Sequence, residues 1–180
     1  NYVTIDTTGN ATNFGNFTRS KYDPAGAANL TRGLFSGGYG GADDNEIEYI
    51  TIATTSDSSD FGDLTLGRQG HAGTSDLTRA VFAGGFASAG YNTNRIDYVA
   101  IATTGNATDF GDMTASLYGV KGTSNGPRGA FVGGTTAAGG GGAGSRQSTT
   151  QYITIATTGN ATNFGNLLGA LQNANVTSGG

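Results

Sequence analysis

The segment QYITIATTGNATNFGN at residues 151–166 has three close copies elsewhere in the chain, and this repetition indicates how the whole protein is built. Each copy has a tyrosine as its second residue: Tyr2, Tyr49, Tyr98 and Tyr152. The tyrosines recur at intervals of about 50 residues, a period that is typical of a supersecondary unit used several times.

Within the repeat, two spacings are constant and one varies. The interval from each Tyr to the Phe of the next Phe-Gly pair is the same in every copy, and so is the interval from that Phe to the following Gly-Gly pair. The interval from the Gly-Gly pair to the next Tyr increases from one unit to the next. Constant spacing is expected of paired strands, and variable spacing of an exposed loop. The recurring positions, which we expect to be structural, are Gly37, Gly38, Gly84, Gly85, Gly133, Gly134, Tyr49, Tyr98, Tyr152, Phe61, Phe110 and Phe164.

Residue types inside the unit favour strands over helices. Ile153, Thr154 and Ile155 alternate as in a half-buried strand, and short apolar runs end at the Gly-Gly pairs. In the second complete unit we expect four strands, at about 66–75, 78–85, 95–102 and 108–113. Four-stranded units at this period predict an all-β fold, namely a β-propeller of antiparallel four-stranded blades.

The units divide the chain into one repeat domain over residues 1–180. We expect complete blades at 17–64, 65–113 and 114–167, the last two strands of a blade at 1–16, and the first strand of one at 168–180. Joining the two ends would give a fourth blade that lacks its second strand. Two interpretations stay open. The chain is part of a longer repetitive polypeptide or larger propeller, or it is a nearly closed ring of about four blades whose edge another chain covers.

Composition excludes several classes of function. The 180 residues include 33 Gly and one His, with no Cys and no Trp. Without Cys there are no disulfides, no thiolate chemistry and no Cys-based zinc or iron–sulfur site. The net charge of −4 argues against a nucleic-acid-binding protein, which would carry a basic stripe. No apolar stretch approaches the roughly 18 residues that a membrane span needs, so we expect no membrane insertion.

The titratable residues form no recognisable catalytic set. His71 has no second His and no Cys with which to form a dyad or a metal site, so we expect a structural role. Glu46 and Glu48 are two residues apart on one expected strand and share a face, so they cannot flank a sugar as a glycosidase pair does. We predict no catalytic residue, no cofactor, no metal and no enzymatic activity.

Two other polar positions recur. One arginine of each unit is expected to form a structural ion pair or hydrogen bond: Arg32, Arg79 and Arg128. The motif [Asp/Asn]-Phe-Gly-[Asp/Asn] offers carboxylates at Asp60 and Asp63 that suit Ca²⁺, but its last copy has uncharged Asn163 and Asn166. A turn in which the Asp or Asn side chain accepts a backbone hydrogen bond fits every copy. Turn geometry is therefore favoured, and Ca²⁺ binding stays open as the alternative.

The loop of variable length, between the second and third strands of each unit, is the expected binding region. We call these three segments the variable loops. Aromatic and amide side chains on exposed loops of a rigid scaffold suit recognition of a carbohydrate or a protein, although plain solvent-exposed loops would have the same composition. The candidate residues are Tyr39, Asp43, Asp44, Asn45, Phe86, Tyr91, Asn92, Asn94 and Arg146.

The order of parts in the second unit resembles the kelch repeat. It runs from RQGHA at 68–72 through RAVFAGG at 79–85 to IDY at 96–98. Two departures from the kelch pattern are the replacement of its Trp by Phe61 and Phe110, and a longer stretch between the Tyr and that aromatic residue. The resemblance implies a β-propeller, and a protein–protein interaction module of a cellular protein, cytoplasmic or secreted, is one function that it suggests.

A second resemblance concerns the amino-acid sequence of the repeat itself. ITIATTGNAT at 153–162 and DFGDLT at 60–65 are similar to tandem repeats in virion structural or tail-fibre proteins of marine tailed phages. This resemblance implies a non-enzymatic component of a tail fibre or surface appendage, located on the virion and with a role in attachment to a host receptor. The implied partners are other virion proteins or further copies of the same chain, together with a carbohydrate or protein of the host surface.

Overall fold

The computed structural model describes residues 1–87, 89–139 and 145–177. Over these residues the protein consists of strands, turns and loops, with no α-helix. The strands form three antiparallel sheets of four strands each and one sheet of three short strands. The predicted all-β fold with antiparallel four-stranded sheets is confirmed. None of the described residues belongs to a helix that could cross a membrane.

Each four-stranded sheet contains the four main strands of one unit, and these strands lie across the sheet in chain order. The first sheet consists of β1 (Ala25–Ala28), β2 (Arg32–Ser36), β3 (Glu46–Thr51) and β4 (Ser59–Asp63). The second consists of β6 (Ala72–Ser75), β7 (Arg79–Ala83), β10 (Arg95–Ala100) and β11 (Thr108–Asp112). The third consists of β12 (Lys121–Ser124), β13 (Arg128–Val132), β14 (Gln147–Thr154) and β15 (Thr162–Leu171). The three-stranded sheet consists of β5 (Arg68–Gln69), β8 (Phe86–Ala87) and β9 (Tyr91–Asn92).

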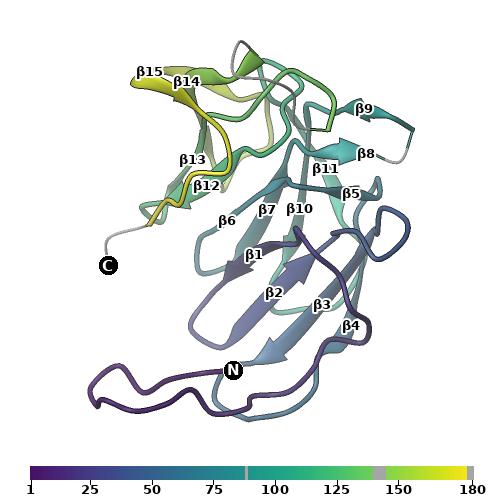
Figure 1. Cartoon of the computed structure of the whole chain (residues 1–180), viewed down its shortest axis with the longest axis vertical. Coiled ribbons are helices and arrows are strands. Elements are labelled where there is room, and N and C mark those ends of the chain that lie inside the picture. Colours follow the sequence, from purple (N-terminus) through teal and green to yellow (C-terminus); the bar gives the residue numbers. More distant parts are fainter. Residues whose placement is uncertain (88, 140–144, 178–180) are drawn as a thin grey trace.

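The three large sheets follow one another along a curve, with the N-terminal segment at one end and the third sheet at the other (Figure 1). The first strands of the units lie next to each other on the inside of this curve. A Cβ atom at Gly73 in β6 would overlap the backbone of Gly26 in β1, and one at Gly122 in β12 would overlap the backbone of Gly73. Glycine at these positions therefore allows the three sheets to approach closely.

A row of hydrogen bonds just before the first strands links the units. The N–H of Gly70 donates to the carbonyl of Asp23 (3.1 Å), that of Gly119 to Gly70 (2.8 Å), and that of Asn173 to Gly119 (2.8 Å). All four residues have positive φ angles, between 54° and 67°. Such angles favour Gly, Asn and Asp, which are the residue types found here. The four positions are therefore structurally equivalent in successive units.

The hydrophobic core lies between the sheets, because each sheet buries one face against the next. The contact between the first and second sheets contains Leu34, Ile47, Phe61, Ala80, Phe82, Val99 and Ile101. The contact between the second and third contains Val81, Ile96, Phe110, Met113, Phe131, Ile153 and Ile155. Burial of such side chains contributes about 1.5–3 kcal/mol each, so the contacts between units, rather than any single sheet, supply most of the stability.

The Gly-Gly pairs lie at these contacts with positive φ angles at both residues of each pair. A Cβ at Gly84 would lie 2.8 Å from the carbonyl oxygen of Leu117 in the next unit. The N–H of Gly85 donates to the same carbonyl (2.7 Å). Gly133 and Gly134 stand in the same relation to Leu171, since a Cβ at Gly133 would lie 2.6 Å from its carbonyl oxygen.

The strands differ in several places from those that we expected. Residues 1–16 form one isolated bridge, between Tyr2 and Thr12, instead of the last two strands of a blade, and the described residues 172–177 form no strand where we expected the first strand of another. The first strand of the second unit, expected at 66–75, is divided into β5 and β6, because Gly70 has a φ of +61° and turns the chain between them. In the third unit, β15 continues to Leu171, beyond the expected boundary at 167. The chain then runs along the inner strands, where Val176 and Thr177 line a hollow together with Gly122.

Candidate functional site

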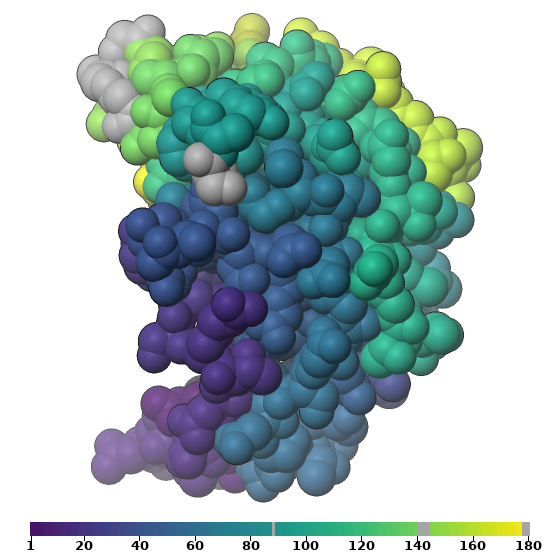
Figure 2. Space-filling view, turned by 90° about the vertical axis from the view of Figure 1, so that its right-hand side faces the viewer, coloured from purple at the N-terminus to yellow at the C-terminus, as the bar shows by residue number. Residues whose placement is uncertain are grey.

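The variable loops of the three units lie along the same side of the molecule (Figure 2). In this view they form one edge, with the first loop in dark blue, the second in teal and the third in green. Their common location follows from the repeat, because each loop joins the same two strands of its sheet at the same end. The structure therefore brings the sequence-predicted loops together on one surface, which we call the loop face.

Two of the variable loops contact each other directly. The side-chain amide of Asn92 in the second loop donates hydrogen bonds to the carbonyls of Thr135 and Ala137 in the third, each at 3.1 Å. Phe86 packs edge-to-face against Tyr118, with ring centroids 6.4 Å apart. These contacts fix the two loops relative to one another, so they form one shared surface rather than two independent loops.

Two tyrosines of the loop face were not among the predicted residues. Tyr22 packs against Tyr39 of the first variable loop, with ring centroids 5.3 Å apart. The hydroxyl of Tyr118 donates to Asp23 Oδ2 at 3.1 Å, and partial burial together with this carboxylate raises the pKa of Tyr118 to about 12. The sequence contains a signal for both, since each stands at the same distance before the Gly-Gly pair of its unit. They precede the first strand of their units and extend the aromatic surface across the molecule.

The acidic residues of the first variable loop have different environments. Asp44 is buried, and its carboxylate contacts Arg19 (3.2 Å) and Lys21 (3.4 Å), so it supports the scaffold. Asp43 is half-buried, and burial raises the pKa of its carboxyl group against a hydrogen bond from Gln69 that lowers it. Asn45 is exposed.

The other predicted loop residues are at least partly accessible. Tyr91 is exposed at the tip of the second loop, and Asn94 is half-buried where that loop joins β10. Arg146 is exposed at the end of the third loop, where its backbone pairs with Thr135. Residues 140–144 of this loop lie outside the described residues.

The recurring Arg, Tyr and Phe form the same stack in each complete unit. Tyr98 packs edge-to-face on Phe110 (5.8 Å), and the guanidinium of Arg79 lies over the Tyr98 ring at 4.7 Å. Arg79 also donates to the carbonyls of Ile155 (3.1 Å) and Ala156 (2.9 Å) in the next unit. The hydrogen bonds agree with the expected structural role of this arginine, and the cation–π contact adds to it.

The same stacks occur in the other units. Arg32 lies over Tyr49 and Arg128 over Tyr152, at 4.7 and 4.9 Å. The paired phenylalanines are Phe61 and Phe164, with ring centroids 5.9 and 6.0 Å from those of the tyrosines. The predicted structural positions Tyr49, Tyr98, Tyr152, Phe61, Phe110 and Phe164 thus form one repeated contact.

The residues considered for catalysis take part in structural contacts. His71 is buried, its Nε2 lies 2.8 Å from the hydroxyl of Ser36, and burial together with nearby Arg68 keeps its pKa well below the usual value. Glu48 is buried with its carboxylate 3.5 Å from Lys21, and it also accepts a hydrogen bond from Thr18. The His71–Ser36 contact joins the first two units, and the contacts of Glu48 hold the segment before β1 against β3 within the first unit.

In three copies the Asp/Asn-Phe-Gly motif forms the expected hydrogen bond from the backbone to the Asp or Asn side chain, but it lies within β4, β11 or β15 and not at a turn between strands. The side chains of Asp60, Asp109 and Asn163 accept hydrogen bonds from the N–H of the glycine two residues later, at 3.0, 3.1 and 2.9 Å. In the described parts of the chain, no three His, Cys, Asp or Glu residues are grouped so that they could hold a metal ion.

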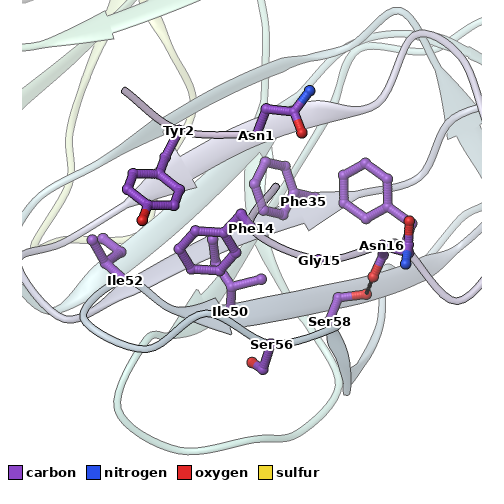
Figure 3. A pocket seen from close by; sticks show the side chains of 11 residues that line it. Asn1, Tyr2, Phe14, Gly15, Asn16, Phe35, Ile50, Ile52, Ser56 and Ser58 are labelled. Atoms are coloured by element: carbon purple, nitrogen blue, oxygen red, sulfur yellow. Dashed lines mark hydrogen bonds between the residues drawn. The ribbon is translucent and has the colours of Figure 1, made fainter. Parts of the chain in front are cut away.

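A hollow of about 410 Å³ lies between the N-terminal segment and the first sheet (Figure 3). Its walls carry mainly apolar side chains, among them Tyr2, Phe14, Phe35 and Ile50. Residues 1–16, which cover this side of the first sheet, form one isolated bridge and no strand, whereas Phe82, which corresponds to Phe35, is completely buried under the first sheet. The hollow has no converging set of polar groups that would suit catalysis.

Taken together, the chain is an all-β repeat protein with a rigid stack of sheets and a loop face of aromatic and amide residues. No model of a known protein family and no curated protein matches it.

Proposed function

We propose that this chain is a non-enzymatic structural protein of a phage virion, in a tail fibre or surface appendage, and that its loop face attaches to a host receptor. The proposal depends on one observation: within each unit, the residues that contact the next unit are constant and the loop residues vary. Corresponding positions of the repeat form the contact between each pair of neighbouring units. The variable loops on one side of the molecule, in contrast, differ in length and in side chains. A constant scaffold that displays variable loops suits recognition rather than catalysis.

We also propose that the sheets belong to a kelch-like β-propeller. Three features support this proposal: the order of strands across each sheet, the position of β6 between β1 and β12, and the hydrogen-bonded row from Asp23 to Asn173. A propeller places the first strand of every blade around a central axis. Gly26, Gly73, Gly122 and Val176, which come from four successive units, line one hollow of about 240 Å³, as such an axis requires.

The absence of enzymatic activity is part of the proposal. Burial of His71 and the pairing of Glu48 with Lys21 support it, because neither side chain is free to reach a substrate. The receptor would be a carbohydrate or a protein, since Tyr39, Tyr91 and Tyr118 offer aromatic surfaces with polar tips.

The location is tested by mass spectrometry and immunogold labelling of purified phage particles from a culture that produces the protein. We expect the protein in intact particles at a constant ratio to the major capsid protein, with label on the tail or on appendages. Its presence in the lysate and absence from the particles would refute a virion role. That outcome would favour the alternative, a cellular kelch-type interaction module that uses the same loop face.

Receptor binding is tested with the isolated chain and host cells. Tyr91→Ala changes the exposed tip of the second variable loop, and Leu77→Ala is a matched control at an exposed apolar position between β6 and β7. We expect the first variant to bind cells at least about tenfold more weakly, as the loss of an aromatic anchor does, and the control to bind normally. Equal binding by both would contradict the role of the loop face.

A further inference from the structure

Successive units are joined by a contact that occurs three times in nearly the same form. In this contact, which we call the joint, the Phe-Gly end of one unit meets the turn after the third strand of the next. The residue after the turn donates its N–H to the Asp or Asn that follows Phe-Gly: Ser58 to Asn16 (2.9 Å), Ala107 to Asp63 (2.7 Å) and Ala161 to Asp112 (2.8 Å).

A second hydrogen bond runs in the opposite direction at each joint. The N–H of the same Asp or Asn donates to a side-chain oxygen of the turn. The pairs are Asn16 with Asp57 (2.8 Å), Asp63 with Asn106 (3.0 Å) and Asp112 with Asn160 (3.0 Å). The joint is therefore specific, because it needs an Asp or Asn at one position of the turn and a close approach of two backbones.

The joint also has an apolar part and a glycine that permits it. Ile101 and Ile155, three residues after the repeat tyrosine, are completely buried in the second and third units. A Cβ at Gly62 or Gly111 would overlap the backbone of the turn in the next unit. At the first joint the counterpart Ile52 is 44% exposed, so the two hydrogen bonds and the tight backbone contact occur at all three joints and the buried isoleucine at the second and third.

Both halves of a fourth joint are present and exposed. On the third sheet, Phe164 is 67% exposed, and nothing lies within 4 Å of a Cβ built at Gly165. On the N-terminal segment, Ile5, the counterpart of Ile101 and Ile155, is 95% exposed. The turn TTGNA at 7–11 has the same sequence as the turn at 157–161, which fills the preceding joint.

We infer that these two surfaces bind each other between copies of the chain, so that the turn at 7–11 of one copy docks on the outer edge of β15 of a second copy. In the docked form, the N–H of Ala11 donates to the carbonyl of Asn166, and Asn10 Oδ1 accepts from the N–H of Asn166. Ile5 covers Phe164. The occupant is a second copy because the N-terminal segment and the third sheet lie at opposite ends of the curve in one chain (Figure 1).

The predicted contact is head-to-tail, since the two surfaces are different. A heterologous contact of this kind builds a closed ring of two or more copies, or an open filament. The inference extends the proposed structural role but rests only on the joints. Absence from virions would contradict the proposed function and leave this inference intact. Failure of the chain to associate would contradict this inference and leave the proposed function intact.

Sedimentation velocity of the chain 1–180 over a range of concentrations tests the inference. We expect concentration-dependent species larger than the monomer. Ile5→Asp and Phe164→Asp should each weaken self-association at least about tenfold, because each places a charge in the apolar part of the joint. Both side chains are exposed, so folding should be retained, and Leu77→Asp at another exposed apolar position is the control that should associate normally.

Mixing the two Asp variants gives the sharpest outcome. Each variant keeps one intact half of the joint, so an equimolar mixture should form a dimer and no larger species. A chain that stays monomeric at all concentrations, variants that associate like the unmodified chain, or a mixture that behaves like its components would each overturn the inference.

A cysteine pair distinguishes contact between copies from closure within one chain. The chain has no Cys, so Ile5→Cys combined with Phe164→Cys introduces the two thiols alone. Under mild oxidation we expect a ladder of covalent oligomers on a non-reducing gel. A disulfide that forms only within single chains would overturn the proposed second copy.

Discussion

The second and third sheets present the same phenylalanine in opposite environments. Phe110 is 3% exposed under the third unit, whereas Phe164, on the outer face of the third sheet, is 67% exposed. Both rings pack edge-to-face on the tyrosine of their own unit, at 5.8 and 6.0 Å. The difference shows that this phenylalanine acquires its burial from the following unit and not from its own sheet. Paired substitutions at corresponding positions can therefore separate what a unit contributes by itself from what the joint contributes.

The largest difference is expected for Phe110→Ala and Phe164→Ala. Truncation of the buried ring should lower the free energy of unfolding by about 3–5 kcal/mol, through lost burial and a cavity. Truncation of the exposed ring should cost less than about 1 kcal/mol. Urea unfolding at low protein concentration measures both. Equal losses in the free energy of unfolding would contradict this interpretation, because they would show that each phenylalanine is stabilised by its own sheet and not by the following unit.

Gly111→Ala and Gly165→Ala extend the comparison between the buried and the exposed copy of the repeat to the glycine of the Phe-Gly pair. Both glycines have similar φ angles, +144° and +149°, so both substitutions strain the backbone by about 1–2 kcal/mol. Only at Gly111 would the new Cβ meet the next unit, 2.6 Å from the backbone of Gly159. We expect a total loss of about 3 kcal/mol or more for Gly111→Ala, and thermal melts should show the gap between the two variants. If both melted together, tight backbone contact at the joint would be disproved.

Arg79→Met and Arg128→Met compare the arginines. Arg79 bonds to two carbonyls of the third unit and stacks on Tyr98, so its loss should cost about 2 kcal/mol. Arg128 stacks on Tyr152 at 4.9 Å on the outer sheet, and its loss should cost about 0.5–1 kcal/mol. Methionine preserves most of the aliphatic packing. Chemical unfolding measures the free energy of unfolding of both variants. A larger loss for Arg128→Met than for Arg79→Met would contradict the prediction.

The smallest difference is expected for Asn160→Ala and Asn10→Ala. Asn160 accepts a hydrogen bond from the N–H of Asp112 at 3.0 Å, and its removal should cost about 1 kcal/mol. Asn10 is exposed, so its removal should be nearly neutral in the monomer. Asn160→Asp is the control, because Asp57 accepts the same bond in the first joint. A neutral Asn160→Ala would show that the side-chain bond is dispensable.

The strands were predictable from the sequence because their spacing is constant and their residue types are those of half-buried sheets. The expected segments 78–85, 95–102 and 108–113 contain β7, β10 and β11. The loop residues Phe86 and Asn92 could be predicted as a group because the length of the chain varies only there. The contacts of Phe86 with Tyr118 and of Asn92 with Thr135 could not be predicted, because Tyr118 and Thr135 belong to another unit.

The joints were not predictable, because they connect residues about one repeat apart in the chain. The sequence shows that Asn106 and Asp63 recur, but not that the side chain of one accepts from the backbone of the other. The length of β15 was missed for a related reason. Its last residues are held by the pairing of Leu171 in β15 with Gln147 at the start of β14, and no short-range pattern signals that pairing.

Amide hydrogen exchange of Ala161 and Ala11 tests most directly the central claim, that the joint sets the environment of the repeat. Both alanines follow Thr-Thr-Gly-Asn, so their intrinsic exchange rates are the same. In the monomeric Phe164→Asp variant, we predict that Ala161, which donates to Asp112, exchanges at least about a hundredfold more slowly than Ala11. In the self-associated chain, Ala11 should become protected as well. Equal rates for the two alanines in the monomer would contradict the account.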